Sequence, residues 1–184
     1  MPRLKHAIVL LGCCLFMAAG PAQAHAPLQS IPSLDVPRYM GVWYELAKFP
    51  NRFQKKCVAD TSASYSLQPD GGVRVLNACR LANGEMQQAL GQALQVGGPQ
   101  SAQLRVRFAP AWLSWLPVVW GNYWVVDLDE GYQLVAISEP RREYLWILSR
   151  SPEVPQERYA ALLERLSKMG LDVQRLEKTV HRQH

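Results

Sequence analysis

The sequence predicts an all-β protein: an eight-stranded antiparallel barrel of up-and-down topology, with one C-terminal helix packed outside and a short ninth strand. Two observations predict this fold. Between residues 58 and 150, short segments of alternating apolar and polar residues are separated by turn residues, which is typical of an antiparallel sandwich or barrel. One stretch of helical periodicity follows at 155–169. Closing eight strands into a barrel removes exposed edges and leaves room inside for one small ligand.

The strands are delimited by turn residues. Val58–Leu67 and Val73–Arg80 flank the segment 68–72, whose Asp-Gly pair supplies the positive φ angles that a tight hairpin needs. Further strands are expected at Gln103–Phe108, Asn122–Leu128, Tyr132–Ser138 and Tyr144–Ser149. The last three are apolar on both faces. Their outer face must therefore be covered, as their inner face is by the barrel interior.

A helix at Pro155–Met169 is expected to provide that cover. Pro155 suits the first turn, the apolar residues recur at helical spacing, and Gly170 ends the helix in a left-handed conformation. A turn of helix near Val36–Met40 precedes the barrel, and the ninth strand is expected near Val173–Leu176. The predicted domain covers residues 34–178, and a polar, flexible tail is expected at 179–184.

The first 24 residues are expected to be a secretory signal peptide. A basic start with Arg3 and Lys5 precedes an apolar run at 7–19, and residues 22–24 form a small-x-small cleavage site. The apolar run is shorter than the about 20 residues that a permanent membrane-spanning helix needs. The same segment also contains a lipobox-like Leu-Leu-Gly-Cys, which would place a lipid on Cys13. We favour cleavage after Ala24, because the residues behind Cys13 are still apolar, where a lipoprotein normally has a polar tether.

The net charge of the 184-residue chain is +5 at pH 7, and removal of the signal peptide takes away two basic residues and lowers it to +3. In an exported protein without a long basic run, this charge does not indicate a nucleic-acid partner. A weak attraction to anionic phospholipid surfaces is the better interpretation. The protein is therefore expected in the periplasm, with attachment to the outer membrane as the alternative if Cys13 is lipidated.

Two cysteines remain after cleavage, Cys57 and Cys79, and in an oxidising compartment such a pair usually forms a disulfide. The hairpin around 68–72 sets Cys79 opposite residues 60–62, so the bond requires the start of the first strand to bulge or curl inward. Metal binding would need further ligands at close spacing, and we expect none.

Three stretches in chain order carry a family resemblance. Gly41–Lys48 (GVWYELAK) matches a Gly-x-Trp opening of the first strand. Asp127–Tyr132 (DLDEGY) stands where the pattern has Thr-Asp-x-x-Tyr, although the threonine is absent and the spacing is stretched. Tyr144–Arg150 (YLWILSR) places an arginine after the eighth strand. Over Leu34 to Leu176 the chain resembles the lipocalin family, and within it the branch of the bacterial outer-membrane lipocalin and apolipoprotein D.

The resemblance implies that Gly41, Trp43 and Arg150 maintain the fold and do not bind the ligand. Trp43 would plug the closed end of the barrel, with the Arg150 guanidinium across its ring, a cation–π contact worth about 1 kcal/mol. The resemblance also implies a protein that binds and stores or transports a lipophilic small molecule, such as a fatty acid or a (lyso)phospholipid, in the bacterial envelope.

Six residues are expected to contact that ligand: Glu45, Phe49, Tyr65, Asn77, Trp112 and Tyr123. Side chains alternate between the two faces of a strand, so Glu45 and Phe49 are expected to point inward like Trp43. The alternation set by the hairpin likewise places Tyr65 and Asn77 inward. A carboxylate facing an apolar cavity is costly unless it is paired or protonated. Glu45 is therefore either hydrogen-bonded by neighbours or held for a ligand head group.

The opposite, open end is expected to be ringed by the loops after the first, third, fifth and seventh strands. Pro50–Lys56 mixes aromatic and basic residues, of which Arg52, Lys55 or Lys56 would meet a phosphate. Ala109–Val119, followed by Trp120, is unusually apolar. Its aromatic side chains fit an inner core layer, a lip that rests on a membrane surface, or a dimer contact, and both a monomer and a homodimer stay open.

The histidines argue against catalysis, because all four lie outside the predicted strands. A catalytic triad, a Cys-His pair or a histidine-ligated haem therefore has no donor inside the barrel. The chain also lacks a Gly-rich phosphate loop and zinc-type Cys/His spacing, so we expect no cofactor and no enzyme. The alternatives are an enzyme that acts on a hydrophobic substrate through a carboxylate pair, and an envelope interaction protein whose barrel is filled.

Overall fold

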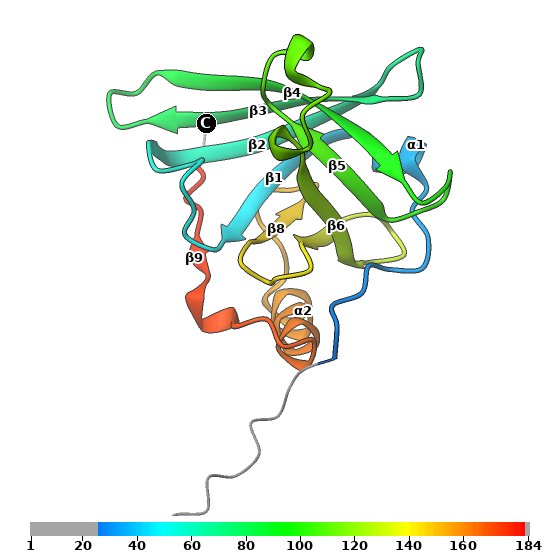
Figure 1. The fold of residues 1–184 in the computed structure, drawn as a ribbon. Coiled ribbons are helices and arrows are strands. Elements are labelled where there is room, and N and C mark those ends of the chain that lie inside the picture. The colour runs from blue at the N-terminus through cyan, green and yellow to red at the C-terminus, as the bar shows by residue number, and fades with distance from the viewer. Residues whose placement is uncertain (1–25, 183–184) are drawn as a thin grey trace, which may run out of the picture.

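The structure is a computed structural model that describes residues 26–182 (Figure 1). The expected signal peptide, Cys13 and residues 183–184 lie outside the described residues. Among the residues described, no helix is both long and apolar enough to cross a membrane.

In the described part of the chain, a single antiparallel sheet has the strand order β2-β3-β4-β5-β6-β7-β8-β1-β9. β1 also pairs with β2, which closes eight strands into a barrel and leaves β9 beside β1 on the outside. The predicted fold class is therefore confirmed. The strands are β1 (Gly41–Lys48), β2 (Cys57–Leu67), β3 (Val73–Leu81), β4 (Met86–Val96), β5 (Gln103–Arg107), β6 (Gly121–Leu128), β7 (Leu134–Ser138), β8 (Leu145–Ser149) and β9 (Glu177–Lys178).

Short helices complete the chain. They are α1 (Val36–Tyr39), the 3₁₀ turns η1 (Ala111–Leu113), η2 (Pro117–Val119) and η3 (Val173–Arg175), and the longer α2 (Gln156–Lys168). The expected ninth strand near 173–176 is instead η3, whose N-cap Asp172 accepts a hydrogen bond from the backbone N–H of Gln174. The strand follows two residues later, where β9 pairs with the end of β1.

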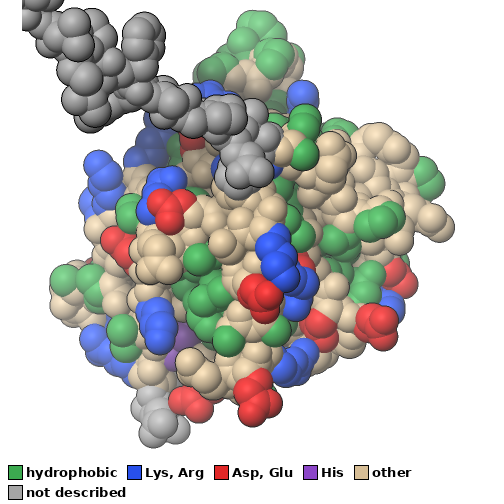
Figure 2. All heavy atoms as spheres, turned by 90° about the horizontal axis from the view of Figure 1, so that it is seen from below, with side chains coloured by type: hydrophobic (Ala, Val, Ile, Leu, Met, Phe, Trp, Pro, Cys, Tyr) green, Lys and Arg blue, Asp and Glu red, His purple; other side chains and the backbone are tan. Residues whose placement is uncertain are grey.

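Helix α2 lies against the outside of the barrel, as Figure 1 shows. Leu162 and Leu166 on its inner face are fully buried and belong to one apolar cluster with Leu134 of β7 and with Leu145 and Ile147 of β8. The side of the molecule on which α2 lies carries acidic and basic side chains interspersed with hydrophobic ones (Figure 2). This packing explains why the late strands are apolar on both faces.

The closed end of the barrel is sealed by Trp43 and Arg150. Trp43 is fully buried, and the Arg150 guanidinium lies 4.0 Å from the centroid of its ring. The same guanidinium donates hydrogen bonds to the carbonyls of Val42 (2.9 Å) and Arg38 (3.0 Å). A Cβ on Gly41, which has φ of +99°, would lie 3.1 Å from Arg150 Nη1. Glycine is therefore needed here both for the backbone conformation and for the close approach.

The start of β2 is irregular, as the disulfide requires. The pairing of β2 with β3 shifts register twice between Cys57 and Ser62, and Asp60 there adopts a positive φ of 53°. The shifts bring the Cα atoms of Cys57 and Cys79 to 5.5 Å apart, and the two residues form a disulfide. The expected disulfide is thus present, together with the bulge that it needs.

The segment after β9 runs between β1 and the irregular start of β2. The Thr179 N–H donates to the carbonyl of Leu46 (2.9 Å), and the Asp60 N–H donates to the carbonyl of Val180 (2.8 Å). The Arg182 N–H donates to the Asp60 carboxylate (2.8 Å). A flexible tail is expected from residue 179 on, whereas the structure binds 179–182 to the barrel. The polar composition does not reveal this, because most of these bonds use the backbone.

We predict that Arg150→Ala lowers the free energy of unfolding by about 2 kcal/mol, since it removes the cation–π contact and charge-assisted hydrogen bonds together. Urea unfolding of the protein measures the loss. Arg141→Ala is the matched control, because Arg141 is exposed and its ion pair with exposed Glu143 contributes little. Equal losses in the two variants would contradict a structural role for the Arg150–Trp43 seal.

Candidate ligand-binding cavity

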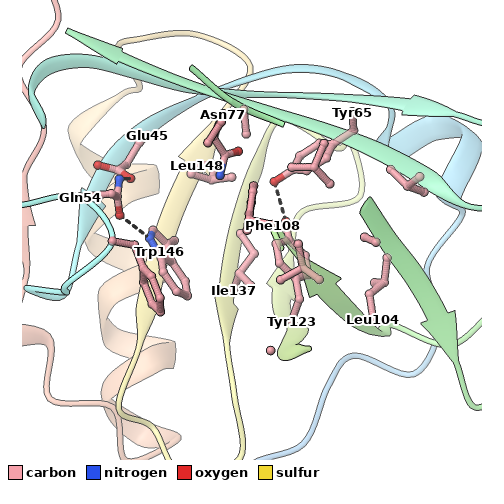
Figure 3. Close-up of a pocket in the computed structure, with 18 of the residues that line it drawn as sticks. Glu45, Gln54, Tyr65, Asn77, Leu104, Phe108, Tyr123, Ile137, Trp146 and Leu148 are labelled. Carbon is pink, nitrogen blue, oxygen red and sulfur yellow. Dashed lines mark hydrogen bonds between the residues drawn. The ribbon is translucent and has the colours of Figure 1, made fainter. Parts of the chain in front are cut away.

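The barrel encloses a cavity of about 630 Å³, which is within the usual size range of small-molecule sites (Figure 3). It extends from Val36 and Tyr39 of α1 at the closed end to Arg52 and Phe53 of the β1–β2 loop at the mouth. Most of its wall is apolar. The apolar wall residues include Val73, Val75, Ala93, Leu104, Val106, Phe108, Ile137 and Leu148.

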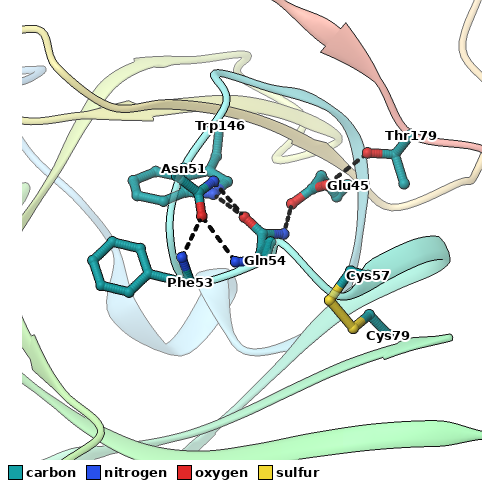
Figure 4. Close-up of a disulfide and its surroundings, with 8 residues drawn as sticks. All are labelled: Glu45, Asn51, Phe53, Gln54, Cys57, Cys79, Trp146 and Thr179. Atoms are coloured by element: carbon teal, nitrogen blue, oxygen red, sulfur yellow. Dashed lines mark hydrogen bonds between the residues drawn. A yellow bond between two sulfur atoms is a disulfide. The ribbon is translucent and has the colours of Figure 1, made fainter. Parts of the chain in front are cut away.

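Glu45 places a carboxylate in this apolar wall near the mouth. It is 2% exposed, and its two oxygens accept hydrogen bonds from Gln54 Nε2 (2.5 Å) and Thr179 Oγ1 (2.6 Å), as Figure 4 shows. The Gln54 side-chain oxygen in turn accepts from Trp146 Nε1 (2.9 Å) and Asn51 Nδ2 (2.8 Å). Burial raises the pKa of Glu45, against the opposing effect of its two hydrogen bonds. The carboxyl group is thus paired by neighbours and still borders the cavity.

Three tyrosine hydroxyls meet toward the closed end. The Tyr123 hydroxyl is 2.7 Å from that of Tyr39 and 3.0 Å from that of Tyr65. Tyr65 lies opposite Gly41, the first residue of β1, and the Tyr39 ring lies 5.0 Å from the Trp43 ring. Burial raises the pKa of all three phenols, to about 12 for Tyr65, so they are neutral hydrogen-bond donors at physiological pH.

Four of the six expected contact residues line the cavity: Glu45, Tyr65, Asn77 and Tyr123. Phe49 does not, which corrects the expectation from strand alternation. Its ring packs in the outer cluster with α2 and under the Arg175 guanidinium. The physical reason is a bulge in β1, where the pairing with β8 skips one residue between Glu45 and Ala47. The bulge reverses the alternation, so Ala47 pairs with outward Ile147 and Phe49 follows it outside the cavity.

Trp112 is the second correction, because it points into solvent with 73% of its surface exposed. Trp115 and Val118 of the same β5–β6 loop are also exposed, at 74% and 87%. The two ends of the loop border the cavity, with Phe108 and Ala109 at its start and Trp120 at its end. The indole N–H of Trp120 donates to the carbonyl of Ser114 (2.8 Å). The inner-core interpretation therefore applies to Trp120, whereas Trp112 and Trp115 are exposed, as both the membrane-lip and the dimer-contact interpretations require.

Sequence reasoning missed four residues of the site: Tyr39, Gln54, Trp146 and Thr179. Tyr39 precedes the first strand, and Thr179 belongs to the expected tail, so no strand alternation covers them. Gln54 lies in a loop, where no regular alternation of side chains indicates which way a residue points. The position of Trp146 could have been predicted, because it lies two residues before Leu148 in β8 and therefore on the same face of the strand. Both side chains line the cavity.

We predict that the carboxyl of Glu45 makes stability fall as pH rises. Because its pKa is raised in the folded state, the folded protein holds this proton more tightly than the unfolded chain, whose value is 4.5. The free energy of unfolding of the wild type relative to Glu45→Gln should therefore decrease from about pH 4.5 toward neutral pH. Urea unfolding across this range measures the difference.

Asp60→Asn serves as a control of opposite sign. Burial opposes ionisation of Asp60, but hydrogen bonds from the Arg182 N–H and from Arg80 outweigh it and lower the pKa of the carboxyl. Its contribution to stability is therefore lost as pH falls through the lowered value. A pH-independent difference between the wild type and Glu45→Gln would contradict a raised pKa of Glu45.

Comparisons with known proteins agree with this architecture. The family model described as a lipocalin-like domain matches residues 34–181. Temperature-induced lipocalin-1 of Arabidopsis thaliana is 43% identical over 155 residues, covering 83% of this chain and 82% of that protein. The outer membrane lipoprotein Blc of Escherichia coli K12 is 36% identical, covering 78% and 77%. Apolipoprotein D of Mus musculus is 33% identical, covering 80% and 77%.

Solved structures with lower sequence identity share the fold. Insecticyanin from the tobacco hornworm Manduca sexta superposes with a TM-score of 0.65 at 18% identity, covering 85% of each chain. Lobster apocrustacyanin A1 superposes with a TM-score of 0.62 at 16% identity, covering 81% of each. With the barrel, the Trp43–Arg150 seal and these relatives together, the chain belongs to the lipocalin family.

Proposed function

We propose that this protein binds and stores or transports a fatty acid or a lysophospholipid in the bacterial cell envelope. The observation that carries the proposal is the apolar cavity of about 630 Å³, which opens at a mouth with basic side chains. An acyl chain matches the apolar wall, and an acidic head group matches the basic mouth. Lipocalins generally bind hydrophobic small ligands and are generally not enzymes, which supports a carrier.

The basic side chains at the mouth support an anionic head group. Arg52 borders the cavity, and both Arg52 and Lys55 border a second hollow directly outside it. The six ion pairs among the described residues do not use Arg52, Lys55 or Lys56. These cations are therefore available to a phosphate or carboxylate at the entrance.

Export to the envelope is supported by three features. The expected signal peptide directs the chain out of the cytoplasm, and the Cys57–Cys79 disulfide suits an oxidising compartment. Bacterial relatives bear the name outer membrane lipoprotein. We propose a periplasmic protein cleaved after Ala24. The intact mass distinguishes this form from one lipidated at Cys13.

Peripheral contact with a membrane surface is proposed for the mouth. Trp112, Trp115 and Val118 of the β5–β6 loop and Phe53 of the β1–β2 loop are exposed, the last at 60%. Arg52 lies over the Phe53 ring, 5.1 Å from its centroid. Exposed aromatic groups next to cations are typical of surfaces that bind anionic bilayers. A lipid would then enter the cavity directly from the bilayer.

We predict that the mature protein co-purifies with lipid and binds 1-palmitoyl lysophospholipid, measured by mass spectrometry of an extract and by quenching of tryptophan fluorescence. Ala93→Phe should weaken binding by about tenfold or more, because Ala93 is buried in the cavity wall and the larger ring takes up ligand space. Ala160→Phe on the exposed surface of α2 is the matched control and should bind like the wild type.

A wild-type protein that carries no lipid and shows no quenching on titration would contradict the carrier and favour a filled barrel. The same fluorescence titration tests whether the basic side chains at the mouth recognise the head group. Replacing Arg52, Lys55 and Lys56 together by glutamine should weaken lysophospholipid binding and leave an uncharged monoacylglycerol unaffected. Unchanged lysophospholipid binding would exclude these cations from head-group recognition.

We predict that Trp112→Ser/Trp115→Ser lowers co-sedimentation with phosphatidylglycerol vesicles by about tenfold, because two exposed indoles lose their place in the interface. Leu90→Ser on the outer face of β4, where Leu90 is 56% exposed, is the control for a general loss of apolar surface. If both variants lose the same amount of binding, or if the wild type does not sediment, the membrane-facing mouth is refuted.

A further inference from the structure

The cavity has two separate polar ends. The end near the mouth holds the carboxyl of Glu45 and the side-chain amide of Gln54, and the end toward Trp43 holds the three tyrosine hydroxyls. Figure 3 shows the Glu45–Gln54–Trp146 group on one side and Tyr65 with Tyr123 on the other. Between them lie the apolar side chains of Phe108, Ile137 and Leu148, together with the amide of Asn77. An entirely apolar ligand would leave the inner polar end without a partner.

A count of protons shows what the inner end lacks. Tyr39, Tyr65 and Tyr123 together carry three hydroxyl protons, and the two hydrogen bonds among them use two. If Tyr123 donates to one neighbour, the proton of that neighbour is unused; if Tyr123 accepts from both, its own proton is unused. Among the described residues, no other protein group bonds to these hydroxyls. One O–H donor in a buried, cavity-lining position therefore always remains for a ligand oxygen.

The charges around this donor indicate a neutral oxygen. The charged residues that line the cavity are Glu45 and Arg52, and both lie near the mouth. Arg150 is nearest to the inner end, but it is engaged with the Trp43 ring and with backbone carbonyls. A buried carboxylate or phosphate needs a cation or several donors. A single phenol suits a hydroxyl, carbonyl or ether oxygen, and a hydroxyl can also donate back to a tyrosine oxygen.

We propose that Tyr39, Tyr65 and Tyr123 form a hydrogen-bonding subsite for a neutral oxygen at the buried end of the ligand. The preferred ligand then carries oxygen at both ends: an acidic head group at the mouth and a hydroxyl or carbonyl group near the far end of its chain. This inference rests on the proposed function, because it assumes that an acyl chain enters the cavity head-outward. The preferred class of lipid is therefore one with an oxygenated acyl chain.

The test compares two pairs of ligands on the wild-type mature protein: hexadecanoic acid with 16-hydroxyhexadecanoic acid, and dodecanoic acid with 12-hydroxydodecanoic acid. Titration calorimetry gives a ratio of dissociation constants within each pair. We expect the hydroxy acid of at least one length to bind as tightly as its parent or tighter. An apolar inner end would instead weaken the hydroxy acid by about tenfold or more, because a buried hydroxyl without a partner is costly.

The triple variant Tyr39→Phe/Tyr65→Phe/Tyr123→Phe removes all three hydroxyls and leaves the rings. We expect it to raise the ratio of the dissociation constant of the hydroxy acid to that of the parent acid by about tenfold. Tyr159→Phe is the control, because Tyr159 belongs to α2 and packs against the outer cluster, outside the cavity. Because both dissociation constants of a pair are measured on the same protein, a general loss of folded protein cancels in their ratio. If the variant does not fold, the comparison within each pair on the wild type still tests the subsite.

The outcomes separate the two proposals. If all four acids fail to bind, the subsite and the proposed carriage of fatty acids are both refuted, and the lysophospholipid titration decides whether the protein carries lipid at all. If the parent acids bind and both hydroxy acids bind about tenfold more weakly, the carrier stands and the subsite is refuted. If the hydroxy acid binds well and the triple variant keeps the same ratio, the oxygen is held elsewhere and the subsite is refuted as well.

Discussion

The bulge in β1 between Glu45 and Ala47 determines how the rest of the protein is arranged around the barrel. Before the bulge, the strand turns Trp43 inward to seal the closed end, and Glu45 borders the cavity. After the bulge, the strand turns Phe49 outward into the cluster under α2. One extra residue thus lets a single strand serve both apolar cores. Beyond Tyr44, β1 no longer pairs with β2, and β9 and the following residues bind at this end of the strand.

The polar groups inside the barrel follow the same division. Those near the mouth are held by loop and C-terminal residues, since Glu45 is bonded to Gln54 and Thr179. Those near the seal are held by α1 and two strands, through the hydroxyls of Tyr39, Tyr65 and Tyr123. Burial makes each group costly unless it is bonded, so these networks restrict which ligand atoms can be accommodated at each end. The apolar wall between them discriminates only weakly.

Much of the fold could be predicted from the sequence, because period-two alternation and turn residues are local signals. The Trp43–Arg150 contact and the Cys57–Cys79 pair followed from a family resemblance and from the compartment. The outward position of Phe49 could not be predicted, because a bulge has no signature in the residues around Glu45. The facing of Trp112 depends on how a loop folds, and the place of Thr179 depends on backbone bonds that any polar residue can make. Strand periodicity therefore identified Tyr65 and Asn77 and could not identify Tyr39.

The path of residues 179–182 has a practical consequence for how the protein is handled. Thr179 is bonded to the carboxyl group that borders the cavity, and Arg182 is bonded at the irregular start of β2. A purification tag or fluorescent protein fused after these residues would be attached beside the ligand entrance. Affinities measured on such fusions would include the effect of the added polypeptide on the entrance. A tag placed ahead of Leu28, which belongs to the outer cluster under α2, avoids this disturbance.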